Sequence, residues 1–318
     1  MTEPTPWIDP ELVAVGAWMK ARGLAAMSPV TAPLSECRVM LDRIGIALRE
    51  YSTPLAREQD VAVPGPHGAI PCRLYLPDGM TRPPLLVYAH GGSFALGTLD
   101  AWDGMLRDLV RESGVAVLSV DYRLAPEYRF PAGFDDMLST ILYAASDGAA
   151  WGVDPTRLAA GGDSAGANLA LGAALALRDA KASPLSFLLQ IYGVYSTNGE
   201  SDAWRRLGTG TYGLSQAQMT WIYEHYLTTP SQRNDWRVAP LNADLKGLPP
   251  THSIVGTLDP LVDDNEAFAQ RLDAAGVPNK LLRYEGLTHG FIRYGPLVRT
   301  AKCAVRECAG ALKRGLTR

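Results

Sequence analysis

The strongest constraint on the fold of this chain is a regular alternation of short apolar runs with longer helical segments. The run at residues 84–89 is almost wholly apolar, as a strand must be when helices cover both faces of its sheet. Alternation of this kind predicts parallel βαβ units wound on both sides of one sheet. In such sheets, ligands bind beyond the carboxyl ends of the strands.

The alternation predicts eight strands and five helices, of which the first two strands form an antiparallel hairpin. The strands are expected at residues 60–63, 69–76, 84–89, 115–121, 157–161, 186–192, 251–256 and 279–284. The helices are expected at residues 101–113, 132–146, 165–180, 262–275 and 296–313. The chain therefore belongs to the α/β class, with a mostly parallel eight-stranded sheet flanked by helices.

Two segments fall outside this alternation. The segment up to residue 55 carries two helical patterns that are separated at Ser28-Pro29. Residues 196–239 are rich in Trp, Tyr, Gly and Asn, with one helix expected over residues 215–226. A long insertion after a strand of this sheet usually covers a pocket, so we expect a cap there.

Charge and cysteine usage exclude several classes of function. The formal net charge is -3, and no basic run is longer than Arg205-Arg206, which argues against a nucleic-acid partner. The 4 cysteines show no metal-ligand spacing, so we expect reduced thiols and no metal site. The sequence shows neither a secretory signal pattern nor an apolar run of about 20 residues, so we expect a cytoplasmic protein without a membrane span.

The pattern Gly162-x-Ser164-x-Gly166 follows a short apolar strand and opens an Ala/Leu-rich helix. A nucleophile on a sharp strand-to-helix turn needs small neighbours, because bulky side chains would clash there. The turn exposes the hydroxyl and aims the helix N-terminus at the developing negative charge. We predict that Ser164 is a catalytic nucleophile; the alternative is that it only caps the helix.

The segment 90–94, His-Gly-Gly-Ser-Phe, follows the apolar strand at 84–89. Glycines at this place let backbone N–H groups face a substrate oxygen, so we predict an oxyanion hole made by Gly92, Ser93 and Ala165. The alternative is an ordinary glycine turn. Phe94 adjoins this loop and is a candidate to contact the substrate, as is Tyr212 among the aromatic residues of the cap.

A nucleophilic serine needs a base within hydrogen-bond reach, and the chain has 5 histidines. Four are set aside by their expected places in an early turn, the oxyanion segment, the cap helix and the start of a strand: His67, His90, His225 and His252. His289 follows the strand at 279–284, at the same edge of the sheet as Ser164. His289 is therefore the predicted base.

An acid that orients the base should lie between the serine and the histidine in the chain. Asp259 is the first carboxylate after the strand at 251–256, and we predict that it holds the imidazole tautomer. Asp263 and Asp264 are the rivals. They fall in the first turn of the next helix, where acidic residues commonly complement the helix dipole.

Five ordered motifs together resemble the hormone-sensitive lipase-like family of microbial esterases, within the α/β-hydrolase superfamily. They are HGGSF at 90–94, DYRLAPE at 121–127, GDSAG at 162–166, DPL at 259–261 and HGF at 289–291. The resemblance covers residues 59 to 315, and the helical segment before them is also family-like.

The resemblance implies an α/β-hydrolase fold with a helical cap. The cap would consist of residues 1–55 and 196–239, and the catalytic domain of residues 56–195 and 240–318. It also implies a carboxylesterase that acts on short to medium acyl esters through a Ser-His-Asp triad and an acyl-enzyme. The partner would be a small-molecule ester, no cofactor would be needed, and a homodimer would be possible because family members often dimerise.

Two positions depart from the family pattern. Ser93 stands where the third glycine of the oxyanion motif is usual, and Tyr128 stands where a histidine usually follows the segment 121–127. That segment is expected to support the oxyanion loop as a structural corner. The departure at Ser93 puts a side chain beside the expected substrate oxygen, whereas the departure at Tyr128 leaves the triad unaffected.

Other functions stay open at this point. An amidase or deacetylase would use the same triad, and lactonase and thioesterase activities are compatible with it. A binding protein on a hydrolase fold should lack the nucleophile or the base, and both residues are present. Epoxide hydrolases and dehalogenases are disfavoured, because they carry a carboxylate where this chain has Ser164.

Overall fold

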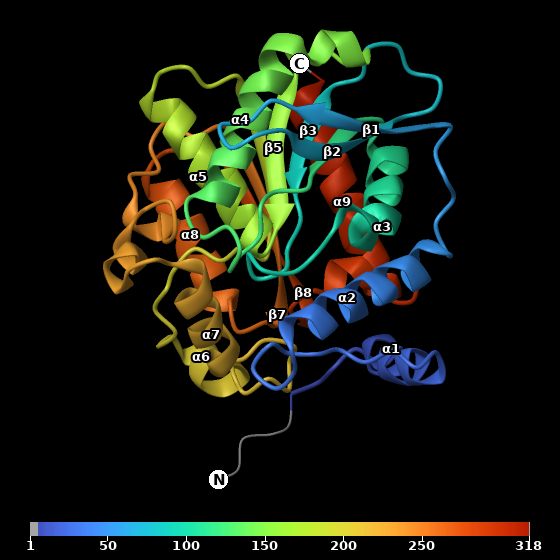
Figure 1. Cartoon of the computed structure of the whole chain (residues 1–318), viewed down its shortest axis with the longest axis vertical. Coiled ribbons are helices and arrows are strands. Elements are labelled where there is room, and N and C mark those ends of the chain that lie inside the picture. Colours follow the sequence, from blue (N-terminus) through green and yellow to red (C-terminus); the bar gives the residue numbers. More distant parts are fainter. Residues whose placement is uncertain (1–5, 318) are drawn as a thin grey trace.

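A computed structural model of the chain describes residues 6–317. Its strands form one 8-stranded sheet in the order β1-β2-β4-β3-β5-β6-β7-β8 (Figure 1). The pairs β1/β2 and β2/β4 are antiparallel, and the other neighbouring pairs are parallel. The strands are β1 Arg57–Val63, β2 Ile70–Leu76, β3 Leu85–Ala89, β4 Ala116–Val120, β5 Leu158–Asp163, β6 Leu185–Ile191, β7 Thr251–Leu258 and β8 Asn279–Thr288. The predicted α/β class and mostly parallel sheet are confirmed.

Helices cover both faces of this sheet, as the continuous apolar strands require. In β3, Leu85, Val87 and Ala89 pack in the core on the side of α4, α5 and α8, whereas Leu86 and Tyr88 pack on the side of α3 and α9. The helices are α1 Pro10–Ala21, α2 Leu34–Arg49, α3 Leu99–Ser113, α4 Ala132–Asp147, α5 Ala165–Asp179, α6 Asp202–Leu207, α7 Gln216–Tyr226, α8 Val262–Ala274 and α9 Arg299–Leu316.

The last strand is longer than its sequence pattern predicts. We expected its end at residue 284, but β8 continues to Thr288, and the register of β7 against β8 shifts between Gly256 and Leu258. Gly286 has φ 70°, which glycine adopts readily and which fits an irregularity in an edge strand. The continuation matters because it carries the chain directly to His289.

The segments outside the strand–helix alternation lie together at one end of the molecule. Helices α1, α2, α6 and α7 occupy the lower part of Figure 1, toward which the parallel strands run. The short helix α6 was not expected from the sequence, because its 6 residues are too few to show a helical period. The division of the chain into a cap and a catalytic domain stays a prediction.

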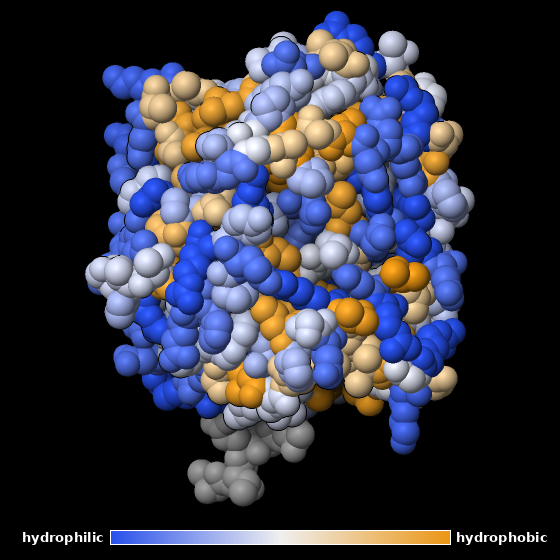
Figure 2. All heavy atoms as spheres, viewed as in Figure 1, coloured by the Kyte–Doolittle hydropathy of each residue, from blue (hydrophilic) through white to orange (hydrophobic). Residues whose placement is uncertain are grey.

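The surface of the molecule mixes polar and apolar residues. Figure 2 shows hydrophilic and hydrophobic residues interspersed over the face that it displays. No helix within residues 6–317 combines the length and the apolar character needed to cross a membrane. Most of the exposed large apolar side chains belong to the N-terminal segment: Trp7, Val13, Val30, Val39, Ile46 and Tyr51.

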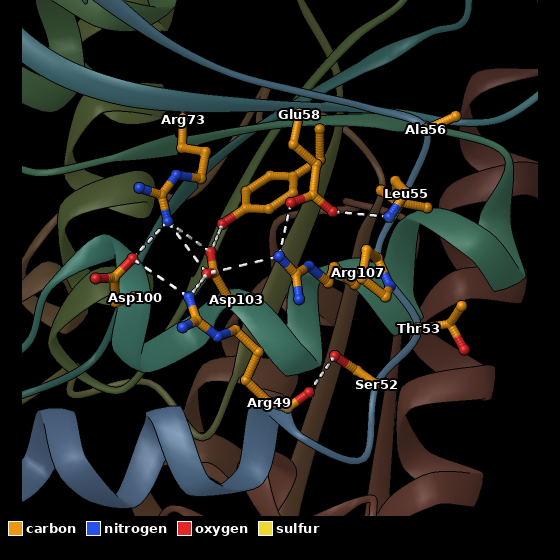
Figure 3. Close-up of polar contacts among 12 residues, drawn as sticks. Arg49, Ser52, Thr53, Leu55, Ala56, Glu58, Arg73, Asp100, Asp103 and Arg107 are labelled. Atoms are coloured by element: carbon orange, nitrogen blue, oxygen red, sulfur yellow. Dashed lines mark hydrogen bonds and ion pairs between the residues drawn. The ribbon is translucent and has the colours of Figure 1, made fainter.

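A cluster of charged residues fastens the N-terminal segment to the sheet (Figure 3). Asp103 of α3 is buried and accepts hydrogen bonds from the Tyr75 hydroxyl and from Arg73 of β2. Arg49, at the end of α2, donates to the same carboxylate at 2.8 Å. Arg73 also pairs with Asp60 on its solvent side at 2.6 Å. A single buried carboxylate therefore joins a helix of the N-terminal segment, a strand and α3.

We expect Asp103→Asn to lower the free energy of unfolding by about 2–3 kcal/mol, because it removes the only buried anion among the carboxylates that pair with Arg49 and Arg73 within residues 6–317. The matched control is Asp60→Asn, since the side chain of Asp60 is 67% exposed and also pairs with Arg73. An exposed pair contributes less than about 1 kcal/mol. Urea unfolding measures both variants. Equal losses would contradict the central place of Asp103.

Candidate active site

Ser164 lies on a strained turn between β5 and α5. Its φ is 54° and its ψ is -117°, and its N–H donates to the carbonyl of Ile191 at 2.9 Å. A Cβ atom on Gly162 or Gly166 would collide with the backbone carbonyl of Ala89, at the end of β3. Glycine is therefore required on both sides of Ser164, as the motif predicted.

The reading of Ser164 as a mere helix cap is wrong. Ser164 occupies the N-cap position of α5, but its side chain makes no capping hydrogen bond. Its Oγ atom lies instead 2.9 Å from Nε2 of His289. The strained turn thus presents the hydroxyl to an imidazole, which is the arrangement that activates a serine nucleophile.

Asp259 completes a line of three side chains. Its Oδ2 atom lies 2.7 Å from Nδ1 of His289, and its Oδ1 atom accepts the N–H of Leu261 at 2.9 Å. Asp259 follows β7 and His289 follows β8, so the carboxyl edge of the sheet brings both side chains to Ser164. An acceptor on Nδ1 keeps the proton on that nitrogen, so that Nε2 can accept the proton of Ser164.

The two rival carboxylates have other surroundings. Asp263 accepts the N–H of Ala203 in α6 at 2.8 Å. Asp264 is buried, and its Oδ2 has no hydrogen-bond partner among residues 6–317. Burial, followed by the charges of Asp263 and Asp259, raises the pKa of Asp264 to about 7. Of these three candidates, the geometry joins only Asp259 to the imidazole.

The environment of His289 favours its charged form. Burial lowers its pKa, but the charge and hydrogen bond of Asp259, together with the charge of Asp163, outweigh burial, so the pKa lies above its usual value. The ring of Tyr192 packs against the imidazole with 4.8 Å between ring centres. A base stabilised in its protonated form is suited to take a proton from Ser164.

The other four histidines do not reach Ser164. Burial lowers the pKa of His90 to about 4, and its ring stacks between Trp102 and Tyr122. His252 is buried at the opposite end of β7. His67 lies 3.5 Å from Asp135, and His225 contacts the carbonyl of Trp221.

The segment 90–94 forms a tight turn with positive φ at three successive residues. The φ angles are 121° at Gly92, 58° at Ser93 and 56° at Phe94. The carbonyl of Gly92 accepts the N–H groups of Ala95 and Leu96 at 3.0 and 2.8 Å. Within residues 6–317, the N–H groups of Gly92, Ser93 and Ala165 donate to no protein acceptor, so all three are available to a ligand.

Four hydrogen bonds hold this turn in place. The N–H of Gly91 donates to Oδ1 of Asp163 at 2.8 Å, which ties the loop to the residue before Ser164. The segment 121–127, predicted to support the loop, contacts it twice: Tyr122 Oη donates to the carbonyl of His90 at 2.9 Å, and the N–H of Ala125 donates to the carbonyl of Phe94 at 2.8 Å. Arg38 of α2 donates to the carbonyl of Ala95 at 2.9 Å.

The two residues predicted to contact substrate differ in burial. The ring of Phe94 is 2% exposed and stacks on Tyr226 of α7 at a centre distance of 4.1 Å, which joins the loop to residues 196–239. Tyr212 is half-buried, and the following Gly213 lies against the backbone of His289. Tyr128, at the other departure from the family pattern, lies on the surface with 53% of it exposed.

Sequence reasoning missed three residues that shape the site. Asp163 was visible inside the GDSAG motif, but the pattern gives no hint that its carboxylate holds the loop at 90–94. Arg38 and Tyr192 carry no local signal, because their partners are far away in the sequence. Among residues 6–317, no cluster of three or more His, Cys, Asp or Glu side chains has an arrangement that could hold a metal ion.

Comparisons with known proteins show which family and which ester hydrolases this chain is similar to. Residues 86–293 of this chain match the sequence profile of a protein family whose description is "alpha/beta hydrolase fold". The carboxylic ester hydrolase LipN of Mycobacterium tuberculosis is 36% identical over 81% of this chain and 70% of its own length. An ethyl acetate hydrolase of Pseudomonas putida is 36% identical over 78% of this chain and 79% of its own length.

Solved structures of esterases are similar over almost the whole chain. An esterase of Pyrobaculum calidifontis superposes with a TM-score of 0.90 at 32% identity, covering 96% of this chain and 98% of its own. The ester hydrolase EH1AB1 from the metagenome of Lake Arreo superposes with a TM-score of 0.91 at 32% identity, covering 98% and 100%.

We expect Ser93→Gly to raise the free energy of unfolding by about 0.5–1 kcal/mol, because glycine adopts a positive φ without strain. The greater conformational entropy of glycine in the unfolded chain offsets part of this gain. The control is Ser146→Gly in the exposed part of α4, where glycine should be destabilising by about 0.5–1 kcal/mol. Urea unfolding compares the two variants. A loss of stability at both positions would show that φ at Ser93 carries no strain.

Proposed function

Because this chain belongs to the hormone-sensitive lipase-like family of α/β-hydrolases, we propose that it is a carboxylesterase acting on short to medium acyl esters. The observation that carries this proposal is the line of hydrogen bonds from Asp259 through His289 to Ser164, of 2.7 and 2.9 Å. The names of the related ester hydrolases, ethyl acetate hydrolase among them, support small esters as the substrate class.

In the proposed reaction, Ser164 Oγ attacks the ester carbonyl carbon while Nε2 of His289 takes the hydroxyl proton. The N–H groups of Gly92, Ser93 and Ala165 bind the oxyanion that forms. When the C–O bond to the alcohol breaks, His289 returns the proton to the leaving oxygen. Water then attacks the acyl-enzyme and loses a proton to His289. When the acyl C–O bond to Ser164 breaks, His289 returns this proton to Ser164 Oγ, and the carboxylic acid leaves. Asp259 stabilises the imidazolium in both halves.

We further propose that residues 6–55 and 196–239 form the cap of this site; residues 1–5 of the expected cap lie outside the described part of the chain. Tyr226 stacks on Phe94, and Gly213 lies against His289, so the inserted segment contacts both the oxyanion loop and the base. Arg38 of the N-terminal segment donates to the carbonyls of Ala95 and Ala125 and forms a two-pronged ion pair with Glu127. Both segments therefore bear on the loop that would bind the oxyanion.

The test is hydrolysis of p-nitrophenyl esters from acetate to laurate by the wild type and by Ser164→Ala. We expect turnover to be fastest on short chains and to fall by about 10⁶-fold in the variant, to the level left by binding and the oxyanion hole. Circular dichroism confirms that the variant is folded.

Full activity in Ser164→Ala would overturn the proposed mechanism. A folded wild-type protein that hydrolyses no ester would contradict the esterase proposal itself. In that case, amide substrates should be assayed next, because an amidase uses the same triad.

The acidic limb of the pH–rate profile should report His289. The base acts only when neutral, and its pKa is raised, so kcat/KM should fall as the pH drops through a value above the usual histidine pKa of about 6.5. Asp259→Asn removes the carboxylate charge. We expect it to move this limb to lower pH and to reduce kcat by about 10³–10⁴-fold.

Asp263→Asn is the matched control for Asp259→Asn. It removes a charge from the first turn of α8, which follows the loop of Asp259, but Asp263 contacts the N–H of Ala203 rather than the imidazole. We expect its kcat to stay within about threefold of the wild type, in line with substitutions that remove no interaction with the reacting groups. If Asp263→Asn lowered kcat more than Asp259→Asn, the assignment of Asp259 as the acid that orients His289 would be contradicted.

A further inference from the structure

The buried ring of Trp102 contacts two opposite charges. Trp102 belongs to α3, is 3% exposed, and donates from Nε1 to Oδ1 of Asp163 at 2.9 Å. The guanidinium of Arg293 lies over the same ring, 4.4 Å from its centre. Arg293 belongs to the short helix Phe291–Tyr294 that follows His289. A cation over the face of the indole and an anion at its N–H edge thus contact the same aromatic side chain.

Arg293 is an unusual buried cation. It is 9% exposed, and within residues 6–317 no carboxylate lies within ion-pair distance of its guanidinium. Nη2 donates to the carbonyls of Ala101 and Leu41 at 3.2 and 3.4 Å, and Nε has no partner in the same range. Burying a guanidinium without an anion is costly, so the π face of Trp102 and a nearby negative charge must offset that cost.

Asp163 is the buried anion at the N–H edge of the ring. Besides Trp102, its Oδ1 accepts from the Tyr88 hydroxyl and from the N–H of Gly91, both at 2.8 Å. Its Oδ2 faces the Tyr192 hydroxyl at 3.4 Å. Burial raises the pKa of Asp163, whereas the hydrogen bonds from Tyr88 and Gly91 and the charges of Arg293 and His289 oppose the rise. A cation above the indole also polarises its N–H toward the acceptor.

The position of Asp163 links this arrangement to the reaction. It immediately precedes Ser164, and its carboxylate holds the N–H of Gly91, where the oxyanion loop begins. Its negative charge also raises the pKa of His289. Whether Asp163 is charged therefore bears on both the donor geometry of the loop and the proton affinity of the base.

We propose that Arg293, acting through the ring of Trp102, is a positioning residue that keeps Asp163 ionised, so that Asp163 holds the oxyanion loop against the nucleophile turn and supports the protonated base. This inference rests on the proposed esterase function. Arg293 touches no reacting atom. Its contribution is electrostatic and reaches the site only through Asp163.

Several other titratable groups lie around this set. Burial lowers the pKa of His90 to about 4, so this ring beside Trp102 is neutral. Burial raises the pKa values of Tyr88 and Tyr192 well above the usual value, so both are protonated donors. Asp42 of α2 faces Arg293 from the outer side and is hydrogen-bonded to Thr98 at 2.7 Å. Asp259 faces His289 from the side opposite Ser164.

The experiment introduces Arg293→Met into the wild type and into Asp163→Asn, with p-nitrophenyl butyrate as substrate over a range of pH. In the wild type we expect kcat to fall about tenfold with KM changed less than about twofold. On the acidic side of the profile, the slope of log kcat against pH should increase from one toward two, because Asp163 now titrates together with His289. Arg293→Lys should recover most of kcat and the original slope.

The Asp163→Asn background supplies the decisive comparison. Asparagine keeps an oxygen that can accept from Gly91 and Trp102 but carries no charge, so Arg293→Met should then change kcat by less than about twofold. Equal losses in both backgrounds, with an unchanged slope, would overturn the proposal and assign Arg293 a purely structural contribution. Trp102→Phe removes the N–H and keeps a ring, and it should also lower kcat only where Asp163 is present.

A second readout separates this inference from the proposed function. Reaction of Ser164 with a p-nitrophenyl phosphonate releases p-nitrophenol once and needs no ester turnover. If the wild type labels but hydrolyses no ester, the esterase proposal fails. The same double-mutant comparison on the labelling rate then still decides for or against Arg293. Thermal unfolding of every variant checks that the differences arise in folded protein.

Discussion

The close approach of two backbones at the end of the central strands is the constraint on which the site depends. Gly162 and Gly166 leave no room for a side chain against the carbonyl of Ala89, so the start of α5 lies directly beside the end of β3. That contact places the strained Ser164 next to the turn that follows β3. The donors expected for the oxyanion and the nucleophile are thus set by one packing contact rather than by separate loops.

Around this contact lie more buried charged groups than the Ser-His-Asp triad alone contains. Two carboxylates, Asp259 and Asp163, act on His289, and burial by itself would disfavour the charged forms of His289 and Asp163. Hydrogen bonds from backbone and hydroxyl groups satisfy the carboxylates, and Arg293 lies behind Trp102. The base is therefore embedded in a network in which two carboxylates stabilise the imidazolium that forms.

Much of this could be predicted from the sequence, because the informative residues are close together in the chain. The eight strands follow from apolar runs, and Ser164, Asp259 and His289 follow from the fact that each comes directly after a strand. The extension of β8 could not be predicted, since Glu285-Gly286 is typical of a turn and only the pairing with β7 makes it a strand. Arg38, Tyr192 and Arg293 could not be predicted either, because each depends on partners 29 to 252 residues away that no local pattern reveals.

The contacts of α2 have a consequence for the exchange of modules between related enzymes. Arg38 holds the carbonyls of Ala95 and Ala125, and Arg49 holds Asp103. A chimaera that takes its first fifty residues from a relative would carry away two cations whose anions and carbonyls stay behind in the recipient. A donor segment for such a chimaera would therefore need arginines at the positions of Arg38 and Arg49. We therefore expect recombination at residue 55 to lower stability, although no helix or strand is interrupted there.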